Sequence, residues 1–249
     1  MPTDMDALTE TLQRMKIVYE NAIRKGKYTE LIRSKRLIET LHEFAVKELK
    51  KRIPPQWIYT DKPLYGYPKT KTQDILIQPQ QDSGKNLSVG PLMSINVRSQ
   101  LSSIDKNYDT LFERLFAEAL NLHNRFPYLV LGYIYLLPKT GYDDKAAKEK
   151  LVKFTERYNI EKYILSFLSI ADREDPEDVP WKYERICLLI VDFERTRPSV
   201  MDNLQVFSTQ GLVSKKFADF FSFETLSVKN FFDDLHKIMM ERYYLLLQS

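Results

Sequence analysis

The chain has 249 residues, of which 43% are hydrophobic and 29% charged, which indicates a globular protein rather than a disordered one. Its net charge of +3 permits nucleic-acid binding without requiring it. The single cysteine, Cys187, excludes an internal disulfide and a cysteine-based zinc site, and its apolar neighbours make it a predicted core residue. No apolar run approaches the ~20 residues of a membrane span, and the N-terminus lacks a signal-peptide core. We therefore expect a cytoplasmic protein without membrane contact.

The first part of the chain is predicted to be helical. Apolar residues recur at helical spacing from Leu8 to Tyr19 and again from Leu31 to Leu49. Lys25-Gly26-Lys27 separates two helices, and Pro54-Pro55 ends the second one because proline cannot continue a helix. The pattern predicts an N-terminal helical region over residues 1–53.

From residue 57 onward the pattern becomes that of strands around one helix. The aromatic and proline-rich stretch 57–68 predicts an irregular loop. Asp74–Ile77 and Leu92–Val97 predict two strands of a hairpin, joined by a polar turn. Residues 109–124 predict an amphipathic helix, and the almost wholly apolar run 128–137 predicts a strand buried on both faces.

Helices and a strand alternate in the rest of the chain. A charged helix is predicted over 144–159 and a more apolar helix over 161–171. A buried strand follows over 185–193, and a terminal helix is predicted over 230–247. This order predicts an α/β protein with a mixed central sheet flanked by helices.

No repeat, low-complexity tract or interdomain linker divides the sequence. We therefore expect one domain over residues 1–249, made of an N-terminal helical region (1–53), a core (57–200) and a C-terminal loop and helix (201–249).

Several polar residues in the predicted core are of the types that phosphodiester hydrolysis uses. Asp74 opens the first strand of the predicted hairpin. Asn96 and Arg98 lie two residues apart on the second strand, so their side chains face the same way. Glu113 and Glu118 follow on the predicted helix. Phosphodiester hydrolysis typically uses a divalent cation held by carboxylates and a cationic side chain near the phosphate.

The motifs between Gly66 and Pro138 also occur in a recognisable order. The chain reads Gly66-Tyr67-Pro68-Lys69, then Asp74 at the strand, then Asn96-Val97-Arg98-Ser99, then Glu118-Ala119 on the helix. This order resembles restriction endonucleases of the PD-(D/E)xK class. In several of them a Gly-Tyr…Lys run leads to an acidic strand, a later strand reads Glu-x-Lys-Ser, and a polar loop and a helix with Glu-Ala follow.

The sequence departs from this pattern at three positions. Gln73 stands where a proline is typical, Asn96 where the second acid is expected, and Arg98 where a lysine usually lies. Asparagine is a neutral and weaker ligand, and arginine cannot be deprotonated to act as a base. In one branch of these enzymes the glutamate comes from the following helix within an Arg…Glu-Ala pattern, which Arg114 and Glu118 match.

The resemblance implies a candidate catalytic set and a cofactor. Asp74 and Glu118 are expected to hold Mg²⁺, Arg98 to contact the scissile phosphate, and Asn96 to complete the site beside them. Glu113 is the fallback for the second acid and is otherwise a surface residue. The implied fold is a restriction-endonuclease-like core.

The resemblance also implies the substrate and the assembly. We expect a type II site-specific deoxyribonuclease that cuts double-stranded DNA as a homodimer or a larger homo-oligomer, because a two-fold dimer supplies one active site for each strand. The polar turn and the start of the following helix are expected to contact DNA through Ser99, Gln100, Ser102, Ser103, Lys106 and Asn107. Candidates for backbone phosphates are Lys69, Lys71, Lys85 and Lys106.

Alternatives remain open for the function and for single residues. The protein could be a nuclease fold that has lost catalysis and only recognises DNA, or a helical interaction protein in which the motif order is coincidence. Gln100 and Asn107 could cap a helix instead of contacting DNA. Glu39 is interpreted as a surface residue rather than an additional acid, and His42 and His123 as histidines on helix surfaces.

Overall fold

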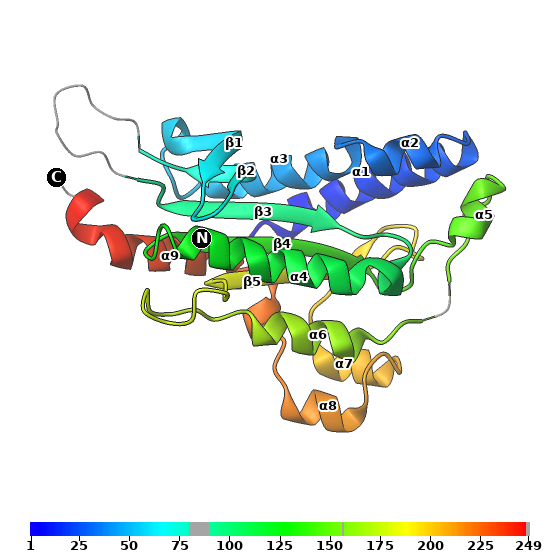
Figure 1. Cartoon of the computed structure of the whole chain (residues 1–249). Coiled ribbons are helices and arrows are strands. Elements are labelled where there is room, and N and C mark those ends of the chain that lie inside the picture. The colour runs from blue at the N-terminus through cyan, green and yellow to red at the C-terminus, as the bar shows by residue number, and fades with distance from the viewer. Residues whose placement is uncertain (80–89, 156, 248–249) are drawn as a thin grey trace.

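A computed structural model describes residues 1–79, 90–155 and 157–247 of the chain (Figure 1). The N-terminal region consists of α1 (Met5–Arg24), the short α2 (Tyr28–Arg33) and α3 (Arg36–Lys50). Asp4 begins α1 by accepting a hydrogen bond from the Ala7 N–H at 2.9 Å, which satisfies one of the free donors of the first turn. The predicted helical region is confirmed, with α2 as a short additional helix after the break.

In the described residues, six strands form one mixed sheet whose spatial order follows the sequence. The first three strands are antiparallel, the third, fourth and fifth are parallel, and the sixth is antiparallel to the fifth. The strands are β1 (Ile58–Tyr65), β2 (Thr70–Ile77), β3 (Met93–Ser99), β4 (Val130–Pro138), β5 (Arg185–Asp192) and β6 (Ser199–Met201). The predicted α/β class with a mixed sheet is confirmed.

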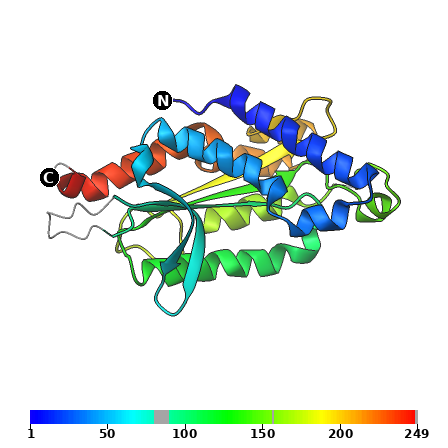
Figure 2. The same cartoon turned by 90° about the horizontal axis from the view of Figure 1, so that it is seen from above.

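Helices cover both faces of the sheet (Figures 1 and 2). One face packs against α1, α3 and the C-terminal α9 (Val228–Leu247), and the other against α4 (Ile104–His123) and α6 (Ile160–Ser169). All nine residues of β4 are buried, which confirms the strand predicted from its apolar run. Cys187 on β5 is buried as predicted. Across the described ranges, no helix has the length and apolar character to cross a membrane.

The loop predicted over residues 57–68 is wrong, because most of this stretch forms β1. A short 3-10 helix, η1 (Pro55–Trp57), precedes the strand. Pro63 lies within β1 opposite Thr72. Proline is tolerated there because β1 is an edge strand, where a missing N–H costs no ladder hydrogen bond on the open side.

Two further predictions are corrected in the second half of the chain. The charged helix predicted over 144–159 is only one short helix, α5 (Asp144–Lys148). It stops because Lys150 adopts a left-handed conformation (φ 63°), which a helix cannot continue. The segment 201–229, predicted as a loop, contains the short helices α7 (Leu204–Thr209), α8 (Lys215–Phe220) and η2 (Glu224–Leu226).

Gly132 fixes the distance between β4 and α9, and its replacement by alanine is expected to destabilise the fold. A Cβ at this position would lie 2.6 Å from Leu235 and 3.1 Å from Phe231, both on α9. Overpacking of this kind costs about 1–3 kcal/mol. Urea unfolding should show this loss for Gly132→Ala. Gly90→Ala is the matched control, because an added Cβ there meets no atom within 4 Å, and an equal loss in both variants would contradict the packing argument.

Candidate active site

The candidate site forms where the hairpin of β2 and β3 opens. Backbone pairing between these strands ends at the Ile75–Ile95 pair. Beyond it, side chains join the strands: the Asp74 N–H donates to Asn96 Oδ1 at 2.8 Å, and the Val97 N–H donates to Asp74 Oδ2 at 2.8 Å. The opening therefore places a carboxylate and a carboxamide between the two strands.

The Asn96 side chain connects this opening to α4. Its amide nitrogen donates to Gln73 Oε1 at 2.9 Å and to Glu118 Oε1. The Ser94 hydroxyl donates to the same Gln73 oxygen at 2.7 Å. Asn96 is buried, and both its oxygen and its nitrogen are engaged in hydrogen bonds. Its position makes it a positioning residue that links Asp74 to Glu118.

Glu118 reaches the opening from α4, and its carboxylate is buried. It lies beside Ala119 and close to Leu115 and Leu122 on the buried side of the helix. The Lys71 Nζ lies 3.7 Å from Glu118 Oε2. Burial raises the pKa of Glu118 above its ordinary value and repulsion from Asp74 adds to the rise, while the charges of Lys71 and Arg98 act in the opposite direction. Glu118 therefore holds its proton more tightly than an ordinary carboxyl group does.

Arg98 is the most exposed member of the cluster. Its Nη1 lies 2.6 Å from Asp74 Oδ2, yet 44% of its side chain is accessible to solvent. A guanidinium in this position binds a carboxylate and can also reach a phosphate from outside. The structure thus brings together Asp74, Asn96, Arg98 and Glu118, the four residues predicted as the catalytic set.

Two residues at this site were not predicted to belong to it. His42 on α3 places Nε2 3.7 Å from Asp74 Oδ2, and this nitrogen is buried with no hydrogen-bond partner in the described part of the chain. Burial lowers the pKa of His42, with attraction to Asp74 opposing the shift. Lys71, predicted only as a phosphate contact, has its ammonium group beside Glu118.

The interpretation of His42 and His123 as surface histidines is wrong. Both side chains are largely buried, and the ring nitrogens of His123 face the carbonyl oxygens of Pro180 and Leu129 at 3.0 and 3.1 Å. A signal existed for His42, which lies three residues before the buried Ala45 on the same helix face.

The predicted DNA-contact residues differ in how far they face solvent. Gln100 is buried; its amide nitrogen donates to the carbonyl oxygens of Ser103 and Ile104 at 3.0 Å each, and its oxygen accepts from the Tyr135 hydroxyl at 2.7 Å. Gln100 does not cap α4, because it donates to carbonyl oxygens and accepts nothing from the N–H groups of the first turn; its amide group is engaged within the protein instead. Ser99 ends β3 half-buried, and Lys106 is exposed on the first turn of α4.

Ser102 and Ser103 are engaged within the protein. The Ser102 hydroxyl lies 3.0 Å from the Tyr28 hydroxyl, and the Ser103 hydroxyl donates to Asp144. Ser103 also has a left-handed backbone (φ 49°) where α4 begins. Lys85 and the side chain of Asn107 lie outside the described residues.

The remaining candidate acids do not join the cluster. Glu39 and Glu113 are exposed on α3 and α4, as expected for surface residues. Within the described ranges, no group of three or more histidine, cysteine, aspartate or glutamate residues could hold a metal ion. Asp74 and Glu118 nevertheless supply two carboxylates, and Mg²⁺ is commonly held by one or two carboxylates together with substrate phosphate. The donor set therefore fits magnesium, provided that the substrate supplies the remaining ligands.

Comparison of the chain with protein-family models, with curated proteins and with solved structures found no match. The interpretation of the site consequently rests on its geometry and on the order of its motifs.

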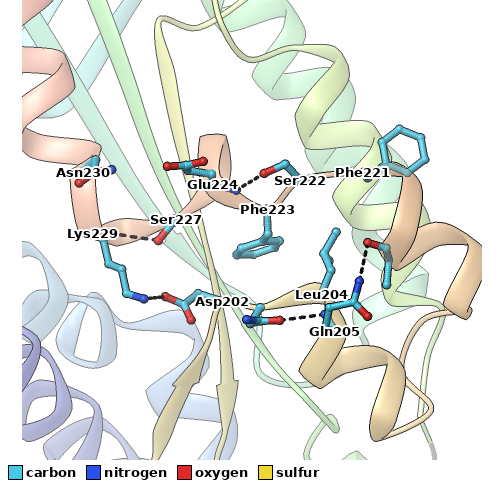
Figure 3. Close-up of a pocket in the computed structure, with 12 residues that line it drawn as sticks. Asp202, Leu204, Gln205, Phe221, Ser222, Phe223, Glu224, Ser227, Lys229 and Asn230 are labelled. Atoms are coloured by element: carbon cyan, nitrogen blue, oxygen red, sulfur yellow. Dashed lines mark hydrogen bonds and ion pairs between the residues drawn. The ribbon is translucent and has the colours of Figure 1, made fainter.

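A hollow of about 410 Å³ lies elsewhere, between α7, α8, η2 and the start of α9 (Figure 3). Its polar groups pair mainly with one another. Lys229 Nζ contacts Asp202 Oδ2 at 2.8 Å, and the Gln205 N–H donates to Asn203 Oδ1 at 2.9 Å. None of the predicted catalytic residues lines this hollow. It is therefore separate from the candidate site.

The raised pKa of Glu118 predicts how stability depends on pH in metal-free buffer. Because the folded-state pKa lies above the ordinary value of 4.5, the folded state binds the proton more tightly than the unfolded state. Ionisation of Glu118 therefore costs stability as the pH rises from 4.5 through the raised pKa. Glu118→Gln, which cannot ionise, should unfold at a higher temperature than the wild type at pH 8 in EDTA, and the two should converge near pH 4. An equal difference at both pH values would contradict this origin.

Proposed function

We propose that the chain is a magnesium-dependent endonuclease that cuts double-stranded DNA at a specific site, in the manner of a type II restriction enzyme. The proposed fold is a restriction-endonuclease-like core, and the proposed assembly is a homodimer or a larger homo-oligomer. One active site per strand then acts on a two-fold symmetric target.

One observation carries the proposal. Asp74 and Glu118 are far apart in sequence and come from a strand and a helix, yet Asn96 bonds to both of them. This supports the expectation, drawn from the motif order, that the second acid comes from the helix when asparagine replaces the usual acid on the strand. Each of the two carboxylates also has a cationic partner: Arg98 contacts Asp74, and Lys71 contacts Glu118.

Magnesium would be held by Asp74 and Glu118. When bound, such an ion neutralises charge on the phosphate and lowers the pKa of the attacking water. Arg98 is exposed enough to hold the scissile phosphate in place. Lys71, with 31% of its side chain exposed, supplies a second cationic group beside Glu118. Asn96 holds the backbone of Asp74 through its amide oxygen and the carboxylate of Glu118 through its amide nitrogen, and Gln73 holds Asn96 in turn.

A DNA-binding protein without catalysis is the second candidate, and one observation favours it. In the cluster, Arg98 pairs with Asp74 and Lys71 with Glu118, so two positive charges already balance two negative charges. A site neutralised in this way needs no metal ion to be stable. Metal binding would have to displace at least one of these contacts.

A cleavage assay separates the two candidates. Purified protein is incubated with supercoiled plasmids of different sequence, in magnesium and in EDTA, and gel shifts are run on the same DNA in EDTA. Discrete fragments that require magnesium support the nuclease. Sequence-dependent shifts without fragments support the binding protein. The absence of both fragments and gel shifts would overturn both candidate functions.

A further inference from the structure

The tip of the β1–β2 hairpin is fixed to α4 by its backbone. The Tyr67 N–H donates to the Asn121 carbonyl oxygen at 2.8 Å, and the Lys69 N–H donates to the Asn121 side-chain oxygen at 3.2 Å. The Asn121 side-chain nitrogen in turn donates to the Lys69 carbonyl oxygen at 2.8 Å. The turn is also closed by the Gly66 N–H, which donates to the same Lys69 oxygen at 3.1 Å. These bonds hold the tip in one position against the helix.

Gly66 allows this close contact. An added Cβ there would lie 2.1 Å from the Asn121 side chain, so the strand could not approach the helix with any other residue. Asn121 lies three residues after Glu118, on the same side of α4. Lys71 on the same hairpin contacts Glu118. The position of the tip relative to the candidate acids is therefore set by the same helix.

This fixed tip exposes aromatic side chains to solvent. Tyr65 and Tyr67 are 65% and 74% exposed, and the tip projects past α4 (Figure 2). The twelve residues from Lys62 to Gln73 include three lysines and no acidic residue. Exposed aromatic rings among positive charges fit a partner that has both flat apolar surfaces and negative charge. Nucleic acid has both, in its bases and phosphates.

We propose that the hairpin tip is a DNA-contact surface, with Tyr65 and Tyr67 packing against bases that become unstacked in the bound duplex and Lys69 against its backbone. This inference rests on the proposed function and names how the same site holds its substrate. Because the backbone of the tip is already held by Asn121, the rings can bind at a low cost in conformational entropy.

The length of the hairpin also sets where the contact falls on the DNA. Asp74 lies four residues along β2 from Thr70, which pairs with Tyr65, so the tip is about 14 Å from the candidate acid at ~3.4 Å per strand residue. Nucleotides of one DNA strand are spaced by about 3.4 Å. Because this spacing is the rise along the helix axis, a duplex whose axis follows the hairpin meets the tyrosines about four base pairs from the scissile phosphate.

The inference is tested by fluorescence anisotropy with a labelled duplex in EDTA, where no cleavage occurs. Tyr65→Ala and Tyr67→Ala should each raise the Kd by about tenfold, the usual effect of losing one aromatic–base contact. Tyr244→Ala, which removes a tyrosine that is 54% exposed on α9, is the matched control and should leave the Kd unchanged.

A second experiment uses a duplex with 2-aminopurine about four nucleotides from the observed cut. Binding of the wild type should change the fluorescence of this base, and binding of the Tyr65→Ala, Tyr67→Ala double variant should not.

The outcomes separate this inference from the proposed function. Wild-type cleavage together with unchanged DNA affinity of both hairpin variants would overturn the hairpin contact alone. A change of oligomeric state in these variants, measured by light scattering, with unchanged DNA affinity would instead make the tip an interface between copies of the chain and also overturn the proposal. Absence of DNA binding by the wild type would overturn both proposals. DNA binding without cleavage, weakened in the hairpin variants, would support the contact and contradict the nuclease.

Discussion

Asp74→Asn is expected to reduce magnesium-dependent cleavage by about a hundredfold or more. The substitution removes one of the two carboxylates proposed to hold the ion, and metal stabilisation of phosphoryl transfer is worth several kcal/mol. The amide keeps an oxygen that can still accept from the Val97 N–H, so the strand opening is preserved. The fold reduction is measured by comparing the cleavage rates of a plasmid with a mapped site under single-turnover conditions. Metal binding is measured separately, by calorimetric titration with Mg²⁺.

Asp192→Asn is the matched control for this variant. Asp192 is also a buried aspartate, and it accepts from Lys139 at 2.9 Å, but it lies on β5 outside the candidate site. This substitution should lower stability and leave the cleavage rate of the folded protein close to that of the wild type. An equal loss of cleavage in both variants would show that the loss comes from a destabilised fold and not from the candidate site. Full cleavage by Asp74→Asn would remove Asp74 from the catalytic set.

The sheet was predictable wherever burial imposed a pattern on the sequence. β4 is apolar throughout because helices cover both of its faces, and the spacing of Leu115, Ala119 and Leu122 shows the buried side of α4. β1 was not predictable, because this edge strand contains Pro63, a residue typical of loops, and its mixed burial leaves no regular apolar pattern. The early end of α5 depends on the backbone of Lys150, for which lysine gives no signal.

The candidate site was predictable only in part for a related reason. Asp74, Asn96, Arg98 and Glu118 follow a motif order that can be read along the chain. Contacts from elements outside this order cannot be read in the same way. His42 comes from a helix that precedes the whole sheet, and only the packing of α3 against β2 and β3 brings it to Asp74.

Glu184→Gln is expected to cause the largest loss of stability of any single charge substitution described above. Glu184 is fully buried, and its carboxylate accepts from Arg173 Nη1 at 2.9 Å, from Arg242 Nη1 at 2.7 Å and from the Leu131 N–H at 2.6 Å. Glutamine cannot neutralise the two buried guanidinium groups. Removing one partner of a buried ion pair costs about 3–5 kcal/mol, which for a chain of this length lowers Tm by roughly 6–20 °C.

The pH dependence of this loss follows from the state of the carboxyl group. Burial opposes ionisation of Glu184, but its hydrogen bond to His123 and the charges of His123 and Arg242 outweigh burial and lower the pKa of Glu184 below 4.5. Its contribution to stability is therefore present above pH 4.5 and is lost as the pH falls through the lowered pKa. Thermal unfolding should show a large gap between wild type and Glu184→Gln at pH 7 that narrows in acid.

Glu194→Gln provides the contrast that isolates burial as the cause. Glu194 also forms an ion pair, with Lys139 at 2.9 Å, but 43% of its side chain is exposed to solvent. Exposed ion pairs contribute about 0–1 kcal/mol because water screens them. The same chemical change should therefore have little effect at Glu194 and a large effect at Glu184, where Arg242 also joins the end of α9 to the sheet. Similar losses at both positions would contradict burial as the cause.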